Sequence, residues 1–366
     1  MHRPGRLCLA FSSFAWYIHA NQKMKVIGMT LLSSIATSAY TDLVRLLKDD
    51  ALSGVTGKPT LKSRGDKAYW YAARRIGTQM RFVYIGEDGP ETRQRIARIE
   101  QLRATGRERQ AERSRLVRLL RAEGMTPTDR ATGSILSAMA GAGVFRLGGT
   151  LVGTNAFRLY EGELGLRLPL GGMANTGDID IAQFQKLSLA LQDQVDPGLA
   201  ETFSALRFDP LPGLDPGKTW RWAQGGSGQL VEFLTPAFGD ETIRPLPALG
   251  VNAQALNYLN FLIAEPIHAA ALYRSGILVQ VPRPERFAIH KLIIADRRRD
   301  GAGSLKAAKD REQAAFLIAA LAEDRPDDLA LALDTALATG RRWRAHVEAS
   351  LARMPETGDT LRGLGL

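Results

Sequence analysis

The chain has 366 residues, of which 45% are hydrophobic and 23% are charged, and its formal net charge is +10. This size and composition predict a globular protein of two or three domains and exclude a disordered or fibrous chain. The only cysteine is Cys8, which excludes a disulfide scaffold, and no apolar run reaches the roughly 18 residues of a membrane span. We therefore expect a cytoplasmic protein without membrane contact.

The first residues resemble a secretory signal only weakly. Two arginines precede an apolar run over residues 7–17, and Met24 and Met29 stand just before the first amphipathic segment. We interpret residues 1–20 as a misassigned start or an extension. Residues 1–57 are then predicted to form an N-terminal extension with one helix.

A small β module and a long helix are predicted over residues 58–125. Alternating side chains predict strands at Pro59–Lys62, Ala68–Ala73 and Met80–Ile85. An arginine-rich helical segment with few apolar positions follows, from Glu91 to Glu123.

Positive charge is concentrated in this module. Residues 61–120 hold 15 Lys and Arg against 7 Asp and Glu, which is +8 of the whole net charge. The triplet Tyr69-Trp70-Tyr71 and the arginines at 74, 75 and 81 suit contacts with bases and phosphates. A solvated helix with paired charges and packed aromatic rings explains the same pattern. Both interpretations stay open: contact with nucleic acid through residues 61–120, or a purely structural role.

The next segment has the pattern of a phosphate-binding junction. Leu151 and Val152 end a predicted strand, Gly153 permits close approach of the backbone, and a helix opens from Ala156. Such a junction directs backbone N–H groups and a helix N-terminus at an anion such as a triphosphate. Gly148-Gly149 is a competing position, but no helix start follows it directly.

Three acidic residues lie on two predicted strands after this junction. Asp178 and Asp180 are two positions apart, so their carboxylates share one face of a strand. Glu232 lies between apolar residues on a second strand. Such carboxylates repel each other unless a cation lies between them, and Mg²⁺ prefers oxygen ligands together with substrate phosphates. Three acids at one sheet edge are enough for two metal ions.

Together these stretches resemble the nucleotidyltransferases of the DNA polymerase beta superfamily, most closely the bacterial abortive-infection and toxin-like branch. The matching segments cover roughly residues 144–320: Val152-Gly153-Thr154-Asn155-Ala156-Phe157, Thr176-Gly177-Asp178-Ile179-Asp180, Glu232-Phe233-Leu234-Thr235-Pro236, Arg286-Phe287-Ala288-Ile289-His290-Lys291-Leu292 and Lys309-Asp310. The chain departs from the family pattern at Thr154, where Gly or Ser is usual, at Glu232, where Asp is commoner, and in its longer spacing before Asp178.

The resemblance implies an α/β (α+β) nucleotidyltransferase fold with a mixed sheet, and a reaction that moves a nucleoside monophosphate from an NTP to an acceptor hydroxyl. Asp178, Asp180 and Glu232 are the implied catalytic and metal-binding residues, for Mg²⁺ or Mn²⁺. The implied nucleotide-binding residues are Gly153, Thr154, Thr176 and Lys291. The acceptor is left open between RNA, a protein and a small molecule, and an inactive fold that binds nucleic acid or a partner is the alternative.

Other chemistries find no support. Asp215-Pro216-Gly217-Lys218-Thr219 imitates the end of a Walker loop, but Pro212 stands where that loop needs glycine. The five histidines lack metal-ligand spacing, and His290 is read as structural unless it touches substrate. Amphipathic segments at 305–322, 326–338 and 341–352 predict a helical lobe. We therefore divide the chain into 1–57, 58–125, 126–300 for the transferase domain and 301–366 for the lobe.

Overall fold

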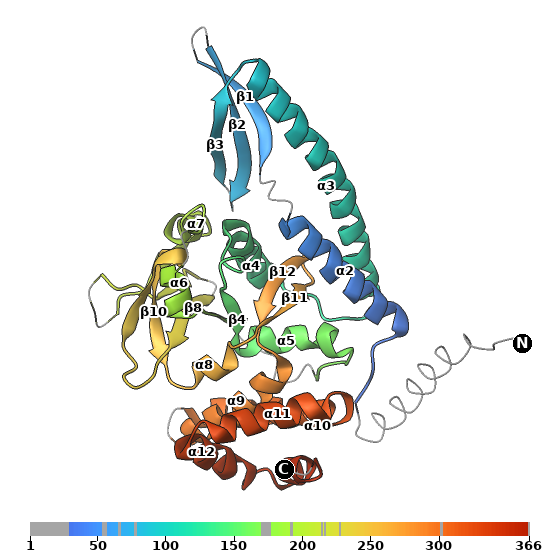
Figure 1. Ribbon diagram of the computed structural model, residues 1–366, viewed down its shortest axis with the longest axis vertical. Helices are drawn as coiled ribbons and strands as arrows, with labels where there is room; N and C mark the ends of the chain where they lie inside the picture. The colour runs from blue at the N-terminus through green and yellow to red at the C-terminus, as the bar shows by residue number, and fades with distance from the viewer. Residues whose placement is uncertain are drawn as a thin grey trace, which may run out of the picture.

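The computed structural model describes residues 29–52, 57–64, 67–76, 79–169, 177–190, 193–213, 215, 217–226, 228–300 and 303–364. Residues 1–20, and with them the predicted N-terminal extension before Met29, lie outside these ranges. Figure 1 shows an elongated molecule with a small sheet at one end, a larger sheet in the middle and the C-terminal helices at the other end. No helix in the described ranges is both long enough and apolar enough to span a membrane.

The N-terminal part consists of helix α2 (Ser34–Leu52) and a three-stranded antiparallel sheet. Its strands are β1 (Lys58–Arg64), β2 (Lys67–Ile76) and β3 (Gln79–Glu87), with β2 in the centre. Each strand contains one of the three segments predicted from alternation, so that prediction is confirmed.

Helix α3 (Pro90–Ala122) begins with proline, which suits a first helical position because no backbone N–H is needed there. Its last turns carry a cluster of buried apolar residues. Leu116, Val117 and Leu120 are buried in one cluster with Leu43 and Leu47 of α2. The C-terminal half of α3 therefore anchors the small sheet to the rest of the molecule.

The aromatic triplet of β2 does not act as one surface. Tyr69 and Tyr71 lie on one face, as alternation requires, and Trp70 lies on the other. The indole Nε1 of Trp70 donates a hydrogen bond of 2.9 Å to Asp88, and Arg93 of α3 also bonds that carboxylate. Trp70 is therefore a structural residue, which corrects its predicted place among base-contacting side chains.

The central sheet is mixed, as predicted. Its strands are β4 (Thr150–Val152), β5 (Asp178–Ala182), β6 (Phe208–Pro210), β7 (Arg221–Gln224), β8 (Leu230–Pro236), β9 (Ile243–Leu246) and β10 (Val251–Leu256). The main order is β4-β5-β8-β10-β9, and β6 and β7 extend from β8. β5, β8 and β10 run parallel, whereas β4 pairs antiparallel with β5.

Strands β5 and β8 alternate between core and cavity. Ile179 and Ile181 of β5, and Val231 and Phe233 of β8, are completely buried. The three candidate acids alternate with these residues along the strands, so their side chains point to the opposite face of the sheet. The short elements α6 (Gln185–Ala190), α7 (Leu199–Ala205), η2 (Pro247–Leu249) and α8 (Leu259–Leu262) complete this part.

Two helices and a hairpin connect the sheet to α2. They are α4 (Arg130–Ala142), α5 (Gly153–Leu164) and the strands β11 (Ile267–Ala271) and β12 (Ile277–Val281). The Tyr40 hydroxyl of α2 accepts a hydrogen bond of 3.1 Å from the Ala270 backbone, and a Cβ on Gly162 of α5 would lie 2.3 Å from the Tyr40 ring. α2 is therefore part of the body rather than a separate extension.

The C-terminal lobe is helical, as the amphipathic segments predict. It contains α10 (Ser304–Asp324), α11 (Pro326–Ala338), α12 (Arg341–Leu351) and also α13 (Pro355–Arg362), which the pattern did not reveal. α10, α11 and α12 pack against α9 (Pro284–Arg297), and α13 packs against α10. The Ser350 hydroxyl donates a hydrogen bond of 2.5 Å to the Leu292 carbonyl. One hydrophobic core continues from the central sheet through these helices.

Candidate functional site

The pairing of β5 with β8 brings the acidic residues together. In the parallel register, Asp180 lies opposite Glu232, and Asp178 precedes Asp180 on the same face of β5. All three side chains line a cavity of about 390 Å³ on this face of the sheet. This juxtaposition places two neighbouring carboxylates from different strands beside a third from the first strand.

We call Asp178, Asp180 and Glu232 the acidic wall of this cavity. Each of its carboxylates makes the ionised form of its neighbours less stable. Burial, followed by the negative charges of Glu232 and Asp178, raises the pKa of Asp180 to about 7. Burial and Asp178 also raise the pKa of Glu232. The wall therefore favours a bound positive charge, because a cation relieves both desolvation and repulsion.

Gly153 lies directly against this wall. It begins α5 with φ at +67°, a conformation that glycine adopts at little cost. A Cβ at this position would stand 2.4 Å from Oδ2 of Asp180. The Asn155 side chain donates a hydrogen bond of 2.7 Å to the Asp178 carbonyl and so fixes the start of α5 against β5. The glycine thus permits the helix and the carboxylate to meet.

The competing glycines lie elsewhere. A Cβ on Gly148 would meet the Leu187 side chain, and one on Gly149 would meet Val144. Gly153 and Thr154 line the cavity, whereas neither Gly148 nor Gly149 does. Thr176 lies outside the described residues.

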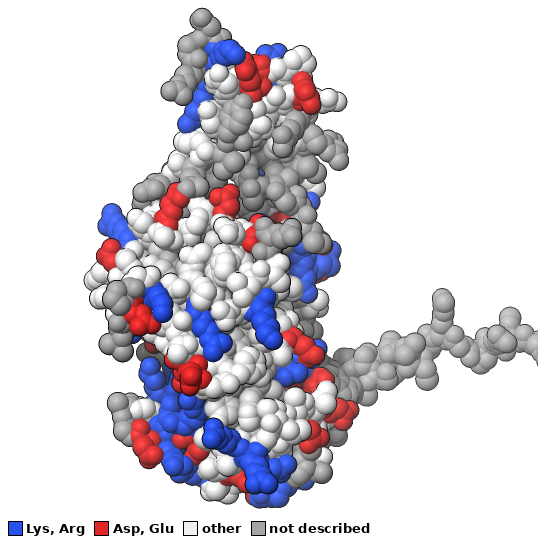
Figure 2. All heavy atoms as spheres, turned by 60° about the vertical axis from the view of Figure 1, so that its left-hand side comes forward, with Lys and Arg blue, Asp and Glu red and all other residues white. Residues whose placement is uncertain are grey.

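A basic wall from α9 and α10 faces the acids across the same cavity. Its cations are Lys291, Arg297, Arg298, Lys306 and Lys309. Figure 2 shows Lys and Arg side chains gathered on the lower part of the molecule, where Figure 1 places the C-terminal helices. Glu241, which pairs with Arg297 at 3.1 Å, and Asp310 also line this side, so the five cations are only partly neutralised. Carboxylates on one side and an excess of cations on the other suit a ligand that combines a divalent cation with phosphate groups.

Lys291 takes a partner that its place in the motif did not reveal. Its Nζ lies 2.5 Å from Oδ1 of Asp310, and Arg298 bonds the other carboxylate oxygen at 2.8 Å. Although burial opposes it, the charges of Lys291 and Arg298 lower the pKa of Asp310. Asp310 therefore positions Lys291 in the cavity wall and partly neutralises it.

The donor types fit a hard divalent cation, because carboxylates are the protein ligands that Mg²⁺ prefers and one or two suffice beside substrate phosphates. The repulsion between Asp180 and Glu232 is the observation that supports this fit. Among the described residues, however, no group of three or more His, Cys, Asp and Glu side chains is arranged to hold a metal ion together. The three carboxylates therefore need further ligands, such as substrate phosphates, to complete a metal site.

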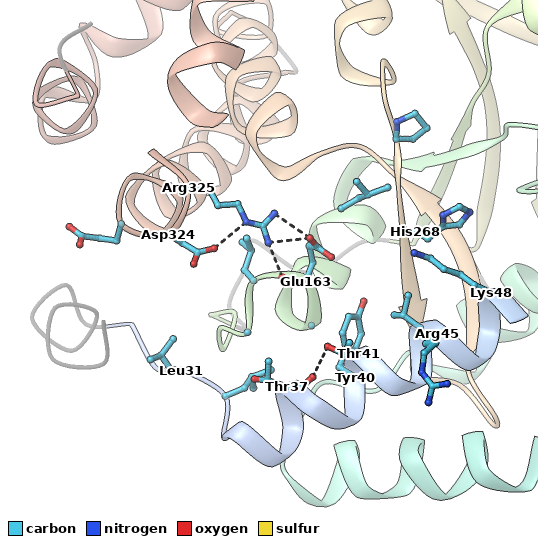
Figure 3. Close-up of a pocket in the computed structure, with 18 of the residues that line it drawn as sticks. Leu31, Thr37, Tyr40, Thr41, Arg45, Lys48, Glu163, His268, Asp324 and Arg325 are labelled. Carbon is cyan, nitrogen blue, oxygen red and sulfur yellow. Dashed lines mark hydrogen bonds and ion pairs between the residues drawn. The ribbon is translucent and has the colours of Figure 1, made fainter. Parts of the chain in front are cut away.

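A larger cavity of about 1050 Å³ lies between α2, the end of α5 and the end of α10. In Figure 3, Arg325 reaches Glu163 and Asp324 on one side, while Arg45, Lys48 and His268 lie on the other. The Arg325 guanidinium neutralises Glu163 and Asp324, and the other two acids of the lining, Asp49 and Glu323, are exposed to solvent. This cavity therefore has no buried carboxylate pair comparable to Asp180 and Glu232 among its described lining residues. The smaller cavity is the better candidate for phosphate chemistry.

Two families match parts of the chain. Residues 130–338, more than half of the chain, match a family described as nucleotidyltransferase. The chain belongs to this nucleotidyltransferase family. Residues 40–94 match a domain of unknown function (DUF6788), which covers part of α2 and the small sheet. No curated protein and no solved structure matches the chain.

The matched region of this nucleotidyltransferase contains every residue of the acidic wall and the basic wall. Sequence motifs located the acids, Gly153 and Lys291, but not Arg297, Arg298 or Lys306. The available signal was the run Arg297-Arg298-Arg299 just after a buried helix. The direction in which these arginine side chains point depends on how α9 packs, so the sequence alone could not assign them to the cavity.

Proposed function

We propose that this protein transfers a nucleoside monophosphate from an NTP to an acceptor hydroxyl, with pyrophosphate as the leaving group. The observation that carries the proposal is one cavity with carboxylates of β5 and β8 on one wall and cations of α9 and α10 on the other. Its volume, about 390 Å³, lies within the range of ordinary small-ligand pockets.

In this proposal Asp178, Asp180 and Glu232 hold Mg²⁺ or Mn²⁺, which would supply charge neutralisation for the triphosphate when bound. Glu232 also faces the acceptor, as a metal ligand or as a base for its hydroxyl proton. Gly153 and Thr154 position phosphates at the start of α5, where backbone N–H groups are free of helical partners.

The basic wall has a complementary task. Lys291, held by Asp310, and the arginine pair at 297 and 298 stabilise the negative charge that builds on the leaving pyrophosphate. Fixed charges of this kind act without reorganisation during the reaction, which is why a buried salt bridge that orients Lys291 is useful here.

The finer assignment rests on the motifs. We propose a place in the bacterial abortive-infection and toxin-like branch, with RNA, a protein or a small molecule as acceptor. We also propose a cytoplasmic location, where NTPs are abundant.

The test is incubation of the protein with labelled NTPs, Mg²⁺ or Mn²⁺ and a cell extract, followed by a search for labelled product. Asp178→Asn should lower labelling by at least about a hundredfold while the folded state is retained, because a charged ligand is lost from a mutually repelling group. Asp209→Asn is the matched control, since Asp209 is exposed on β6 of the same sheet. Unchanged labelling by folded Asp178→Asn would refute the proposal.

The alternative is a binding protein whose transferase fold does not turn over substrate. In that case polyanions bind through residues 61–120 irrespective of Asp178 and Asp180, and NTP binding shows no dependence on divalent metal. Calorimetric titration of NTP with and without Mg²⁺ separates the two functions.

A further inference from the structure

The small sheet has two unlike faces. One carries Trp70 and Gly86, which the pairing places side by side. This face is turned toward α3: Trp70 bonds Asp88 and a Cβ on Gly86 would lie 3.1 Å from the Thr92 hydroxyl of α3. Ile96, one turn further along α3, is 4% exposed. The start of α3 therefore covers the part of this face around Trp70 and Gly86.

The opposite face carries three partly exposed aromatic rings. Tyr69, Tyr71 and Phe82 share it, because β1 pairs Lys62 with Tyr69 and the ammonium of Lys62 lies over both the Phe82 and the Tyr71 rings. Its Nζ is 3.0 Å from the Phe82 ring centroid. Phe82 is 41% exposed, and the two tyrosines are half-buried.

The charges on this open face are mainly positive. Lys58 and Lys62 are exposed on β1, and the exposed Glu87 of β3 is neutralised by Lys67 at 3.0 Å. Several arginines of α3 are already paired: Arg109 and Arg113 with Asp50, and Arg115 with Glu112. Lys58 and Lys62 therefore place positive charge beside the partly exposed ring of Phe82 and the half-buried rings of Tyr69 and Tyr71.

We propose that this open face binds single-stranded nucleic acid, with Tyr69, Tyr71 and Phe82 stacking on bases and Lys58 and Lys62 contacting phosphates. The ammonium of Lys62 over the Phe82 ring places a cation and an aromatic surface side by side, and the flexible side chain of Lys62 can turn from the ring to a phosphate while a base stacks on the ring. Bases of a duplex are stacked on each other and do not reach such rings, whereas those of a single strand do.

The charge excess of residues 61–120 supplies the electrostatic part of binding. An acidic peptide would use the lysines but would gain little from three aligned rings, so single-stranded nucleic acid uses more of the surface. Binding by this face does not require nucleotidyl transfer in the catalytic cavity, and the two are tested by separate experiments.

The test is fluorescence anisotropy with the full-length protein and labelled single-stranded RNA and DNA of about 12 nucleotides, a length within the span of comparable surfaces. Tyr71→Ala and Phe82→Ala should each weaken binding about tenfold, the order expected for one stacked base. Lys62→Glu should weaken binding further and reduce its salt dependence. The RNA and DNA arms show which single strand is preferred.

Two variants serve as controls. Leu61→Ala removes an apolar side chain of 44% exposure from the face that also carries Trp70, and Arg45→Ala removes an exposed cation from α2. Both should bind as the parent protein does. Phe82→Leu keeps apolar bulk without the flat ring, so its loss of affinity with an unchanged melting temperature separates stacking from folding.

Three results would overturn the inference. They are the absence of binding at low salt, equal affinity of the parent and the folded ring variants, and tighter binding of a duplex or an acidic peptide than of either single strand. Strong binding that survives all ring substitutions would assign the surface to charge alone.

Discussion

At the scale of single residues, the geometry of the candidate site depends on the glycine at the start of α5. Gly153 has φ at +67°, and any Cβ there meets the Asp180 carboxylate at 2.4 Å. In Gly153→Ala we expect a cost of about 1–2 kcal/mol from the left-handed backbone and a displaced Asp180. NTP affinity measured by calorimetry should fall about tenfold or more, since small misplacements in such sites are costly.

Gly148→Ala is the matched control, because Gly148 has φ at +90° and its Cβ would strike Leu187 at 2.6 Å, outside the cavity. Both variants should melt at lower temperature, but only Gly153→Ala should lose NTP affinity. An equal loss in both would assign the effect to general destabilisation.

His290 provides a prediction about pH. Burial, followed by the charge of Lys291, lowers its pKa from 6.5 to about 3, with Arg298 and Arg297 adding to the effect and Asp310 opposing it. The folded protein therefore leaves His290 neutral where an unfolded chain binds a proton, so stability is present above pH 6.5 and is lost as the pH falls toward 3.

Between pH 7 and pH 5 this group lowers the free energy of unfolding by about 2 kcal/mol. His290→Gln lacks this component. The free energies of unfolding of the parent and of this variant are measured by urea unfolding without divalent cations. The difference between them should change by that amount between pH 7 and pH 5. Parallel pH curves would contradict a buried neutral histidine.

At the scale of elements, one buried ion pair joins α9 to α10. The side chain of Asp310 is 2% exposed and that of Lys291 is 9% exposed. Asp310→Leu leaves the ammonium of Lys291 without its carboxylate, and we expect a loss of about 3–5 kcal/mol in urea unfolding. The double variant Lys291→Met with Asp310→Leu should recover most of this loss, because the uncompensated charge is gone.

The exposed pair between Arg45 and Asp42 on α2 is the comparison, since both side chains are more than half exposed. Asp42→Ala should leave unfolding almost unchanged because such pairs are screened by water. If the double variant is no more stable than Asp310→Leu alone, the stabilising role of the pair lies in its geometry rather than in charge compensation.

At the scale of the molecule, the small sheet is joined to the body through α2 and the C-terminal half of α3. Asp50 at the end of α2 pairs with Arg113 of α3 at 2.8 Å. A variant in which a short Gly-Ser linker replaces residues 54–104 therefore keeps the buried cluster of Leu43, Leu116 and Leu120.

We expect this variant to retain the parent's NTP affinity and most of its thermal stability while losing affinity for single-stranded nucleic acid. Cutting the chain just before α4 is a different experiment, because it also removes α2, whose Tyr40 packs on Gly162 and Ala270. Loss of NTP binding in the linker variant would show that the small sheet supports the cavity.

The sequence by itself determined the strands that carry Asp178, Asp180 and Glu232, the turn at Gly153 and the amphipathic helices of the lobe. These features depend on residues a few positions apart, through alternation, helical period and backbone freedom. Only the tertiary structure decided that β5 and β8 pair in a register that sets Asp180 beside Glu232, that Asp310 engages Lys291, and that Trp70 is separated from its two tyrosine neighbours. Each of these depends on which surfaces pack together across long stretches of chain, because burial and charge act through space and are not encoded in local spacing.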